Sequence, residues 1–552
     1  MINLAPAPAP SRQKELGAFY TPPAMARVLT NWAVRSPRDR ALDPSFGGLV
    51  FLAAARDRLR ELGAQDDAIA KQLFGVDVDG DAHAAAREGG WLGLDRGHFL
   101  REDFFSVESS RLPPFEALIG NPPYIRYQDF NGSASAARQL ALDAGVKLTG
   151  LASSWAPFVV HATSFVAPGG RLAQVLPAEL LHAQYAREVV QFLCREFERI
   201  FIAVFDERVF PGALEDVVLL FAEGRGAKGM AEVRLVPCAS VADVEQQLKE
   251  AGEAKSDRPR ATGNGRLLSQ LLPAEAHRLY DRTAAHREVH RLGEIASVDI
   301  GIVTGANAFF VLDQDAAAEM HSDLLKPAVA KAAQVAGARL SAQDHRELLH
   351  RGQRGLMLVA DAGTPAEVLA SVQDHLARGE RAELHERYKC RIRDPWWALP
   401  IPQQGAPDLL LTYCSNEHPR LALNDAKVLN TNTIHGVRVS DGVEARVLAA
   451  GFYNSLTLLS AELEGRSYGG GVLKLEPTEA EALLLPPLPL ELAALLPAVD
   501  QAVRARDIDA AAELVDPLTL GALGFDANDI TRLRLARRQL QLRRKSRGRK
   551  PA

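Results

Sequence analysis

One stretch of the sequence has residue types suited to a specific chemistry: the run FEALIGNPPYIRY at residues 115–127. Its first five residues are typical of a short buried strand, and Gly120 allows a sharp turn into Asn-Pro-Pro-Tyr at residues 121–124. Two consecutive prolines fix φ and remove two backbone donors, so the loop presents hydrogen-bond acceptors on a rigid edge. Open α/β sheets bind ligands at the carboxyl ends of their strands, which is where this loop is expected.

Such an edge suits an amino group that is conjugated to a ring or a carbonyl. The lone pair of that nitrogen is delocalised, so the group is a poor nucleophile. The amide oxygen of Asn121 and the carbonyl of Pro122 can accept both of its hydrogens and favour a pyramidal nitrogen with a localised lone pair. Tyr124 can stack on the planar group that carries the nitrogen. The same tetrapeptide is also compatible with a plain turn at the end of a strand.

Length and composition limit the class of protein. With 552 residues, the chain is too long for one ordinary core, and two or three domains are expected. The sequence has 47% hydrophobic and 24% charged residues and lacks both a long apolar run and a signal-peptide pattern, which predicts a cytoplasmic protein without a membrane segment. Four widely separated cysteines indicate neither a disulfide framework nor a zinc site, and no metal is expected.

The charge distribution gives a mixed signal about nucleic acid. The net charge of −5 argues against a nucleic-acid partner. However, the segment from Arg532 to Lys550 holds ten Lys and Arg residues and no acid. A local basic stripe can contact phosphates whatever the global charge. A solvated terminal tail explains the same residues equally well.

Two segments upstream of the loop have the residues of a ligand site. The run FYTPP at residues 19–23 precedes a helical pattern, in which Thr21 is a candidate N-cap whose helix N-terminus can hold an anion. The run DPSFGG at residues 43–48 predicts a strand, a tight turn and a helix start. Glycines at such a turn let the backbone pass close to a bound ligand.

Acidic residues end the next two predicted strands. Asp77 follows the strand that begins at Leu73, and its two coplanar carboxylate oxygens can accept both hydroxyls of a ribose. Asp79 is instead predicted to cap the following helix. Asp103 stands where the third strand should end.

Taken in order, these segments resemble the gamma class (TaqI-like) of S-adenosylmethionine-dependent, adenine-specific DNA methyltransferases of restriction-modification systems. The resemblance extends from Gly17 to about Pro487. It implies an α/β fold: an N-terminal Rossmann-like methyltransferase domain with a seven-stranded mixed sheet, and a C-terminal α+β target-recognition domain. It also implies S-adenosyl-L-methionine as cofactor and double-stranded DNA as partner, with room for a companion restriction endonuclease. The sequence departs from the family pattern at Leu49, where a second glycine is usual.

The resemblance assigns roles to individual residues. Asn121, Pro122, Pro123 and Tyr124 form the catalytic motif, and a flipped-out adenine stacks between Tyr124 and Phe210. The implied cofactor-binding residues are Phe19, Tyr20, Thr21, Asp43, Pro44, Gly47, Asp77, Val78, Asp103, Phe104 and Asn121.

Composition along the chain and the family resemblance together predict its domain plan. We expect a disordered leader (1–14), a catalytic domain (15–245), a linker (246–265), a target-recognition domain (266–487) and a C-terminal helical region with a basic tail (488–552). Residues 131–150 are polar and small, which predicts a mobile loop.

Three other interpretations remain open. The acceptor of the methyl group can be a protein glutamine or a guanine in RNA. The chain can be a DNA-binding subunit with a weak cofactor site, an interpretation that Leu49 motivates. An endonuclease in the same chain is the third, because Pro407-Asp408 with Asp425-Ala426-Lys427 fits a loose nuclease pattern.

Overall fold

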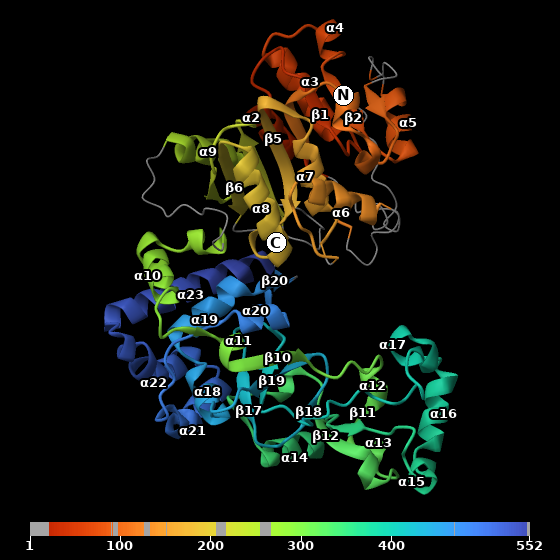
Figure 1. Ribbon diagram of the computed structural model, residues 1–552, viewed down its shortest axis with the longest axis vertical. Coiled ribbons are helices and arrows are strands. Elements are labelled where there is room, and N and C mark those ends of the chain that lie inside the picture. The colour runs from red at the N-terminus through yellow and green to blue at the C-terminus, as the bar shows by residue number, and fades with distance from the viewer. Residues whose placement is uncertain are drawn as a thin grey trace. The chain divides into compact units, whose positions relative to one another are not determined.

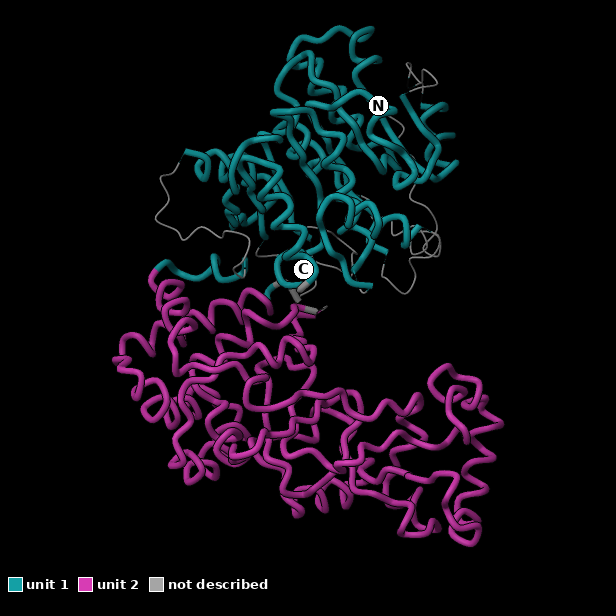
Figure 2. The backbone as a smooth tube through the Cα atoms, in the orientation of Figure 1, with its two compact units in different colours: residues 1–274, 546–552 teal, residues 275–545 magenta. Residues whose placement is uncertain are grey.

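The computed structural model describes residues 21–89, 91, 98–125, 133–150, 152–205, 217–253, 267–468 and 470–548. The chain divides into two compact units (Figure 2). Unit 1 comprises residues 1–274 and 546–552, and unit 2 comprises residues 275–545. Among the described residues, the helices are too short or too polar to cross a membrane.

Unit 1 is built on one eight-stranded sheet in the order β3-β2-β1-β4-β5-β7-β6-β8. All of its strands run parallel except β7, which is antiparallel to β5 and β6. The strands are β1 (Ala41–Asp43), β2 (Leu73–Val76), β3 (Phe99–Leu100), β4 (Phe115–Gly120), β5 (Val166–Pro177), β6 (Arg199–Phe205), β7 (Val217–Glu223) and β8 (Glu232–Cys238).

This arrangement confirms the predicted Rossmann-like α/β fold with a mixed sheet, but the sheet has eight strands rather than seven. The additional strand is β8, which pairs with β6 along its whole length, from Glu232 opposite Arg199 to Cys238 opposite Phe205. Strand β8 thereby supplies hydrogen-bond partners for backbone groups along β6 that would otherwise be unpaired at the edge of the sheet.

Helices lie on both faces of this sheet (Figure 1). Helix α2 packs against α3 and against β4 and β5, and α7 packs against α6 and α8. The helices of unit 1 are α2 (Pro23–Ala33), α3 (Val50–Glu61), α4 (Asp66–Ile69), α5 (Gly80–Glu88), α6 (Ala134–Asp143), α7 (Trp155–Thr163), α8 (Gln184–Glu196) and α9 (Val244–Glu253). The segment 131–150, expected as a loop, contains α6, because Ala137 and Ala141 bury one face of that helix. Helix α9 overlaps the first part of the expected linker.

Unit 2 combines several small sheets with a helical region. Its sheets have the strand orders β10-β19-β15-β17-β13, β11-β14-β12-β18, β16-β21-β20 and β22-β9. The strands are β9 (His290–Arg291), β10 (Ala296–Ile300), β11 (Val311–Leu312), β12 (Leu325–Val329), β13 (Arg339–Leu340), β14 (Leu356–Leu358), β15 (Leu409–Thr412), β16 (Cys414–Ser415), β17 (Leu421–Asn424), β18 (Leu429–Asn430), β19 (Ile434–Val439), β20 (Arg466–Tyr468), β21 (Val472–Lys474) and β22 (Leu484–Leu485).

The helices of unit 2 fall into a set among the sheets and a set near the C-terminus. The first set is α10 (Ala274–Ala284), α11 (Leu292–Ile295), α12 (Asn307–Phe310), α13 (Gln314–Ala317), α14 (Ala342–His350), α15 (Ala366–Ala370), α16 (Gln373–Arg381) and α17 (Tyr388–Arg391). The second set is α18 (Ala445–Gly451), α19 (Ser455–Glu464), α20 (Pro477–Glu481), α21 (Leu492–Arg504), α22 (Ile508–Thr519) and α23 (Ala527–Gly548).

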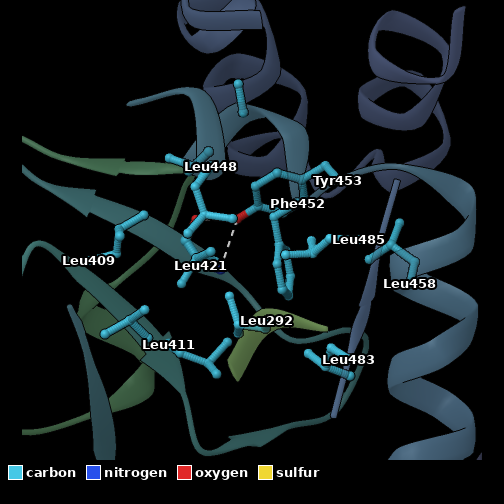
Figure 3. Packing of buried hydrophobic residues seen from close by; sticks show 14 of the residues in the cluster. Leu292, Leu409, Leu411, Leu421, Leu448, Phe452, Tyr453, Leu458, Leu483 and Leu485 are labelled. Carbon is cyan, nitrogen blue, oxygen red and sulfur yellow. Dashed lines mark hydrogen bonds between the residues drawn. The ribbon is translucent and has the colours of Figure 1, made fainter. Parts of the chain in front are cut away.

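The largest core of unit 2 joins its five-stranded sheet to these C-terminal helices (Figure 3). Tyr453 belongs to this core and is completely buried. Its hydroxyl donates a hydrogen bond to the carbonyl of Leu421 (3.1 Å) and accepts one from the Leu421 amide (3.2 Å). A buried hydroxyl costs free energy unless it is hydrogen-bonded, so this contact fixes the helix α18 end against strand β17.

Helix α23 carries the basic run of the sequence, and most of its charges are paired inside unit 2. Arg544 and Glu462 are each only 5% exposed and form a two-bond ion pair at 2.8 and 2.9 Å. Other basic residues of the run also contact carboxylates: Arg532 with Glu275 and Asp529, Arg534 with Glu513 and Asp516, Arg537 and Arg538 with Asp509, and Lys545 with Glu417. These ion pairs therefore hold α23 against the other elements of unit 2.

Replacing Glu462 by Gln is expected to destabilise unit 2 by about 3–5 kcal/mol, because the buried Arg544 guanidinium loses its counter-charge. The matched control is Glu417→Gln, since its partner Lys545 is the next residue of the same helix but is partly exposed. That control should cost less than about 1 kcal/mol. Calorimetric unfolding of both variants is the measurement, and equal losses of stability would contradict the assignment.

Candidate active site

The carboxyl ends of β1, β2 and β4 meet at one edge of the unit 1 sheet, because the three strands are parallel and adjacent. Gly120 ends β4 with φ +153°, a conformation that favours glycine. A β-carbon at this position would lie 2.9 Å from Oδ1 of Asp43, at the end of β1. The two strand ends can approach this closely only because residue 120 has no side chain.

Asp43 is completely buried at this edge. Its Oδ1 accepts a hydrogen bond from the Ser45 amide (3.1 Å), whereas its Oδ2 has no partner among the described residues. Burial raises the pKa of the Asp43 carboxyl to about 8, the Ser45 amide opposes this shift, and the nearby Asp77 adds to it. At neutral pH the carboxyl therefore holds a proton and can act as a hydrogen-bond donor.

Asp77 follows β2 and holds the glycine-rich turn. Its Oδ2 accepts a hydrogen bond from the Gly47 amide and its Oδ1 one from the Asp79 amide, both at 2.8 Å. Burial raises the pKa of Asp77, against these two hydrogen bonds. The next side chain, Val78, is 59% exposed and offers an apolar surface beside the carboxylate. Asp79 caps α5 through the Asp81 amide, as predicted.

The Asn121 side chain is oriented by Thr21. The Asn121 amide donates from Nδ2 to the Thr21 hydroxyl (3.1 Å), which fixes which end of the amide is the acceptor. The backbone carbonyl of Asn121 accepts a hydrogen bond from the Ser45 hydroxyl (3.1 Å). Thr21 is not the N-cap of α2, contrary to expectation: the helix begins at Pro23 with Pro22 at the N-cap and no side-chain cap.

A second hydroxyl holds the rest of the loop. Ser154, completely buried before α7, donates to the Pro123 carbonyl (2.5 Å) and accepts from the Ile125 amide (2.8 Å), and its own amide donates to the Ile125 carbonyl (3.0 Å). The Tyr124 hydroxyl donates to the Val175 carbonyl on β5 (2.9 Å). Sequence reasoning missed Ser45 and Ser154, because a serine in a turn or before an apolar helix is usually a local cap.

Of the other residues predicted to bind the cofactor or the target base, three are described by the structure: Asp103, Phe104 and Pro44. Asp103 follows β3 and accepts hydrogen bonds from the Phe105 amide (3.0 Å) and the Ser133 hydroxyl. The Phe104 ring is buried against α7, with ring centroids 4.8 Å from Phe158 and 5.1 Å from Phe165. Buried Pro44 lies beside the end of β4. Phe19, Tyr20 and Phe210 lie outside the described residues.

Leu49 stands where the family pattern has a glycine, and its backbone has a conformation that glycine adopts readily. Its φ of +65° and ψ of 9° are left-handed, and it is the N-cap of α3. Left-handed backbone costs a leucine about 1–2 kcal/mol. The side chain is 1% exposed, and burying a leucine stabilises by about 1.5–3 kcal/mol. Burial therefore offsets the backbone strain, and the turn keeps its shape without the second glycine.

The residues of the nuclease-like pattern have structural contacts. Asp425 pairs with Arg339 and Arg446, and Asp408 accepts a hydrogen bond from the Val439 amide (3.2 Å). Within the described ranges, acidic, histidine and cysteine side chains form no group able to hold a metal ion.

Each of the two units contains a segment that matches a known protein family. Residues 6–192 match the N-6 DNA methylase family, and residues 264–520 match the C-terminal domain of the type II methyltransferase M.Eco57I. Over 514 residues the chain is 28% identical to the type II methyltransferase M.XamI of Xanthomonas campestris pv. amaranthicola, covering 87% of each sequence. The chain is therefore similar, over most of its length, to type II methyltransferases.

A second relative and a solved structure extend the comparison. The chain is 21% identical over 481 residues to the type II methyltransferase M.AccI of Acinetobacter calcoaceticus, covering 85% of the chain and 84% of the relative. Its fold also matches the type IIL restriction-modification enzyme MmeI, solved in complex with DNA, with a TM-score of 0.59 and 12% identity. That match covers 96% of the chain and 80% of MmeI, and shows similarity of fold.

The Asp43 carboxyl should make the stability of unit 1 fall as pH rises. Its folded-state pKa lies above the unfolded value, so between about pH 4 and pH 8 the folded state retains a proton that the unfolded state has released. This lowers stability by up to ~1.4 kcal/mol per pH unit. Calorimetry from pH 5 to 8.5 should show a flatter profile for Asp43→Asn. The exposed Asp67→Asn variant should follow the wild type, and parallel profiles for all three proteins would refute the assignment.

The strain at Leu49 predicts an unusual order of stabilities. Both Leu49→Gly and Leu49→Ala should be less stable than the wild type, because each loses a buried side chain. Glycine tolerates the left-handed N-cap, so Leu49→Gly should be more stable than Leu49→Ala by about 1 kcal/mol. Inside the same helix the order should reverse, with Ala55→Gly less stable than the wild type by about 1 kcal/mol. Denaturant unfolding of the three variants measures both differences.

Proposed function

We propose that this chain transfers the methyl group of S-adenosyl-L-methionine to the exocyclic amino group of an adenine in duplex DNA. One observation carries the proposal: the Asn121-Pro122 acceptors stand at the carboxyl edge of a methyltransferase sheet, fixed from both sides by buried or half-buried hydroxyls. The type II names of its relatives support a role in restriction-modification, with a companion endonuclease as the expected partner.

The residues at the ends of β1 and β2 fit the cofactor. Asp43 has a buried carboxyl oxygen without a partner in the described part of the chain, which is a hydrogen-bonding group that a polar ligand would satisfy. Asp77 and exposed Val78 together offer acceptors for ribose hydroxyls and an apolar surface for a purine. We assign Thr21, Pro44 and Gly47 to the same site, and Asp103 and Phe104 to the end that holds the adenine. When bound, S-adenosylmethionine supplies a methyl group activated on a sulfonium.

The loop provides the catalysis mainly by positioning. An adenine must leave the base stack before its amino group is accessible. We assign the two amino hydrogens to Asn121 Oδ1 and the Pro122 carbonyl, and the ring to Tyr124, with Phe210 as its second stacking partner. Acceptors held in place before the substrate arrives need no reorganisation when charge develops on the nitrogen. Pro122 and Pro123 contribute by keeping the loop rigid.

The reaction is tested by transfer of labelled methyl from S-adenosylmethionine to unmethylated bacterial DNA, followed by nucleoside analysis. Label in N6-methyladenine is the expected result. Label in another base would overturn the choice of target. Label in protein or RNA but not in DNA would favour the other acceptors that this loop chemistry allows.

Replacing Asn121 by Ala should lower the rate of methyl transfer by roughly 10²–10³-fold, because the substrate loses one fixed acceptor. The matched control is Asn31→Ala on α2, where the amide donates to Glu245 at the surface (3.1 Å). Equilibrium binding of S-adenosylmethionine should persist in both variants, which separates catalysis from folding. Full methyl transfer by Asn121→Ala would rule out the assigned role.

A further inference from the structure

A cluster of exposed cations in unit 2 lies around α17. The segment from Arg387 to Arg393 holds four basic residues and no acid. Arg387, Lys389 and Arg391 are exposed, and none of them forms an ion pair with a carboxylate in the described part of the chain. The Lys389 and Arg391 cations lie 5.3 and 5.9 Å from the ring centre of Tyr388, which is 62% exposed. We call residues 387–393 the α17 segment.

These cations differ from those of helix α23. The basic residues described there are held by carboxylates of unit 2, so little of their charge is available to another molecule. In the parts of the chain that the structure describes, the cations of the α17 segment have no such carboxylate partners. Because binding to phosphates is driven by cations that can displace counter-ions, the α17 segment is the better candidate for a nucleic-acid contact.

The α17 segment is held rigidly in place. Cys390 is completely buried, and Arg393 donates hydrogen bonds to the carbonyls of Thr304 (3.0 Å) and Val303. Gly305 has φ +81°, and a β-carbon there would lie 3.0 Å from the Cys390 sulfur and 3.1 Å from the β-carbon of Lys389. The loop that ends in Asn307 is therefore packed directly against α17. The backbone that carries Lys389 and Arg391 is therefore held in place before binding, which lowers the entropy cost of ordering it.

A cavity of about 600 Å³ lies beside the segment. Its polar lining includes Asn307, Asn432 and Arg387. The Thr304 hydroxyl donates to the Asn307 amide oxygen (2.5 Å), and the Asn307 amide nitrogen approaches the Asn432 amide oxygen at 3.5 Å. Asparagine amides pair with two atoms of adenine, and an arginine fork pairs with two atoms of guanine. These are the side chains that read base edges.

We propose that this surface of unit 2 contacts the duplex DNA substrate, with Lys389 and Arg391 on phosphates and Arg387, Asn307 and Asn432 on the base edges of the recognition sequence. The proposal rests on the proposed function, because it assigns the specificity of the same methyl transfer. Phosphate contacts fix the register of a protein on DNA, and base contacts specify the sequence, so the two groups have separable signatures.

The phosphate contacts are tested with the double variant Lys389→Ala/Arg391→Ala of the full chain. Its affinity for duplex DNA should fall roughly 10–100-fold at 0.1 M salt, and its slope of log affinity against log salt should be shallower by about two. The control Arg346→Ala/Arg351→Ala removes two exposed cations of the same unit around α14 and should bind as the wild type does. Equal slopes for the wild type and both double variants would overturn the phosphate assignment.

The base contacts are tested by mapping methylated adenines, by single-molecule sequencing, in a host that lacks other adenine methylation. Arg387→Ala and Asn432→Ala should each methylate sites that differ from the wild-type sequence at one position, because a lost base contact relaxes discrimination there by roughly 5–150-fold. Asn416→Ala, another exposed asparagine of unit 2, should keep the wild-type sequence. If Arg387→Ala and Asn432→Ala also keep the wild-type sequence, the base assignment is wrong.

The two levels of the proposal fail in different ways. If the wild type methylates no adenine, the proposed function fails, and the salt dependence of DNA binding still tests the α17 segment. If the wild type methylates a defined sequence and the variants match it in slope and sequence, the inference fails and the proposed function stands.

Discussion

The contact between Gly120 and Asp43 is the constraint on which the candidate site depends. Parallel strands β1 and β4 end together, and the buried Asp43 carboxyl occupies the space that a side chain at position 120 would need. Any larger residue would push the Asn-Pro-Pro-Tyr loop away from the turn that follows β1. That turn in turn supplies Ser45, which holds the Asn121 carbonyl. One absent side chain thus couples the assigned methyl-donor region to the assigned acceptor loop.

Two hydroxyls then fix the Asn-Pro-Pro-Tyr loop. One belongs to Thr21, just before α2, and the other to Ser154, just before α7. Thr21 holds the side chain of Asn121, and Ser154 holds the backbone on both sides of Tyr124. The loop carbonyls of Asn121 and Pro123 accept hydrogen bonds from the hydroxyls of Ser45 and Ser154, which lie outside the loop. The result is a set of acceptors whose directions are set by neighbouring elements. Preorganisation of this kind is what an amino nucleophile requires, because the acceptors must be in place before charge develops on it.

Much of the frame was predictable from the sequence, because strand-ending acids and glycine turns recur in register along a doubly wound sheet. The pairing of distant hydroxyls was not, since neither Ser154 nor Ser45 has a local pattern that reveals a partner 31 or 76 residues away. Leu49 shows a different limit. Its residue type argued against the turn, yet the side chain is buried deeply enough to offset a left-handed backbone. Helix α6 was missed because tertiary packing, rather than local composition, decides a short polar segment. Strand β8 was also missed, although its buried Val233 and Leu235 alternate with polar residues as in a strand.

Charge shows most clearly why a sequence alone leaves function incomplete. A run of ten basic residues at the C-terminus is the strongest electrostatic feature of the printed sequence, whereas the α17 segment has only four. In the folded chain the shorter segment has more charge available to another molecule. Carboxylates from α19 and α22 form ion pairs with the described part of the longer run. Those ion pairs are local to the fold and are screened little where they are buried, so they bind α23 to unit 2 and leave it a weak electrostatic field outside. The α17 cations project from a segment whose buried cysteine and carbonyl-bound arginine occupy its inner side. Their charge therefore acts on whatever approaches that surface, which in our proposal is duplex DNA.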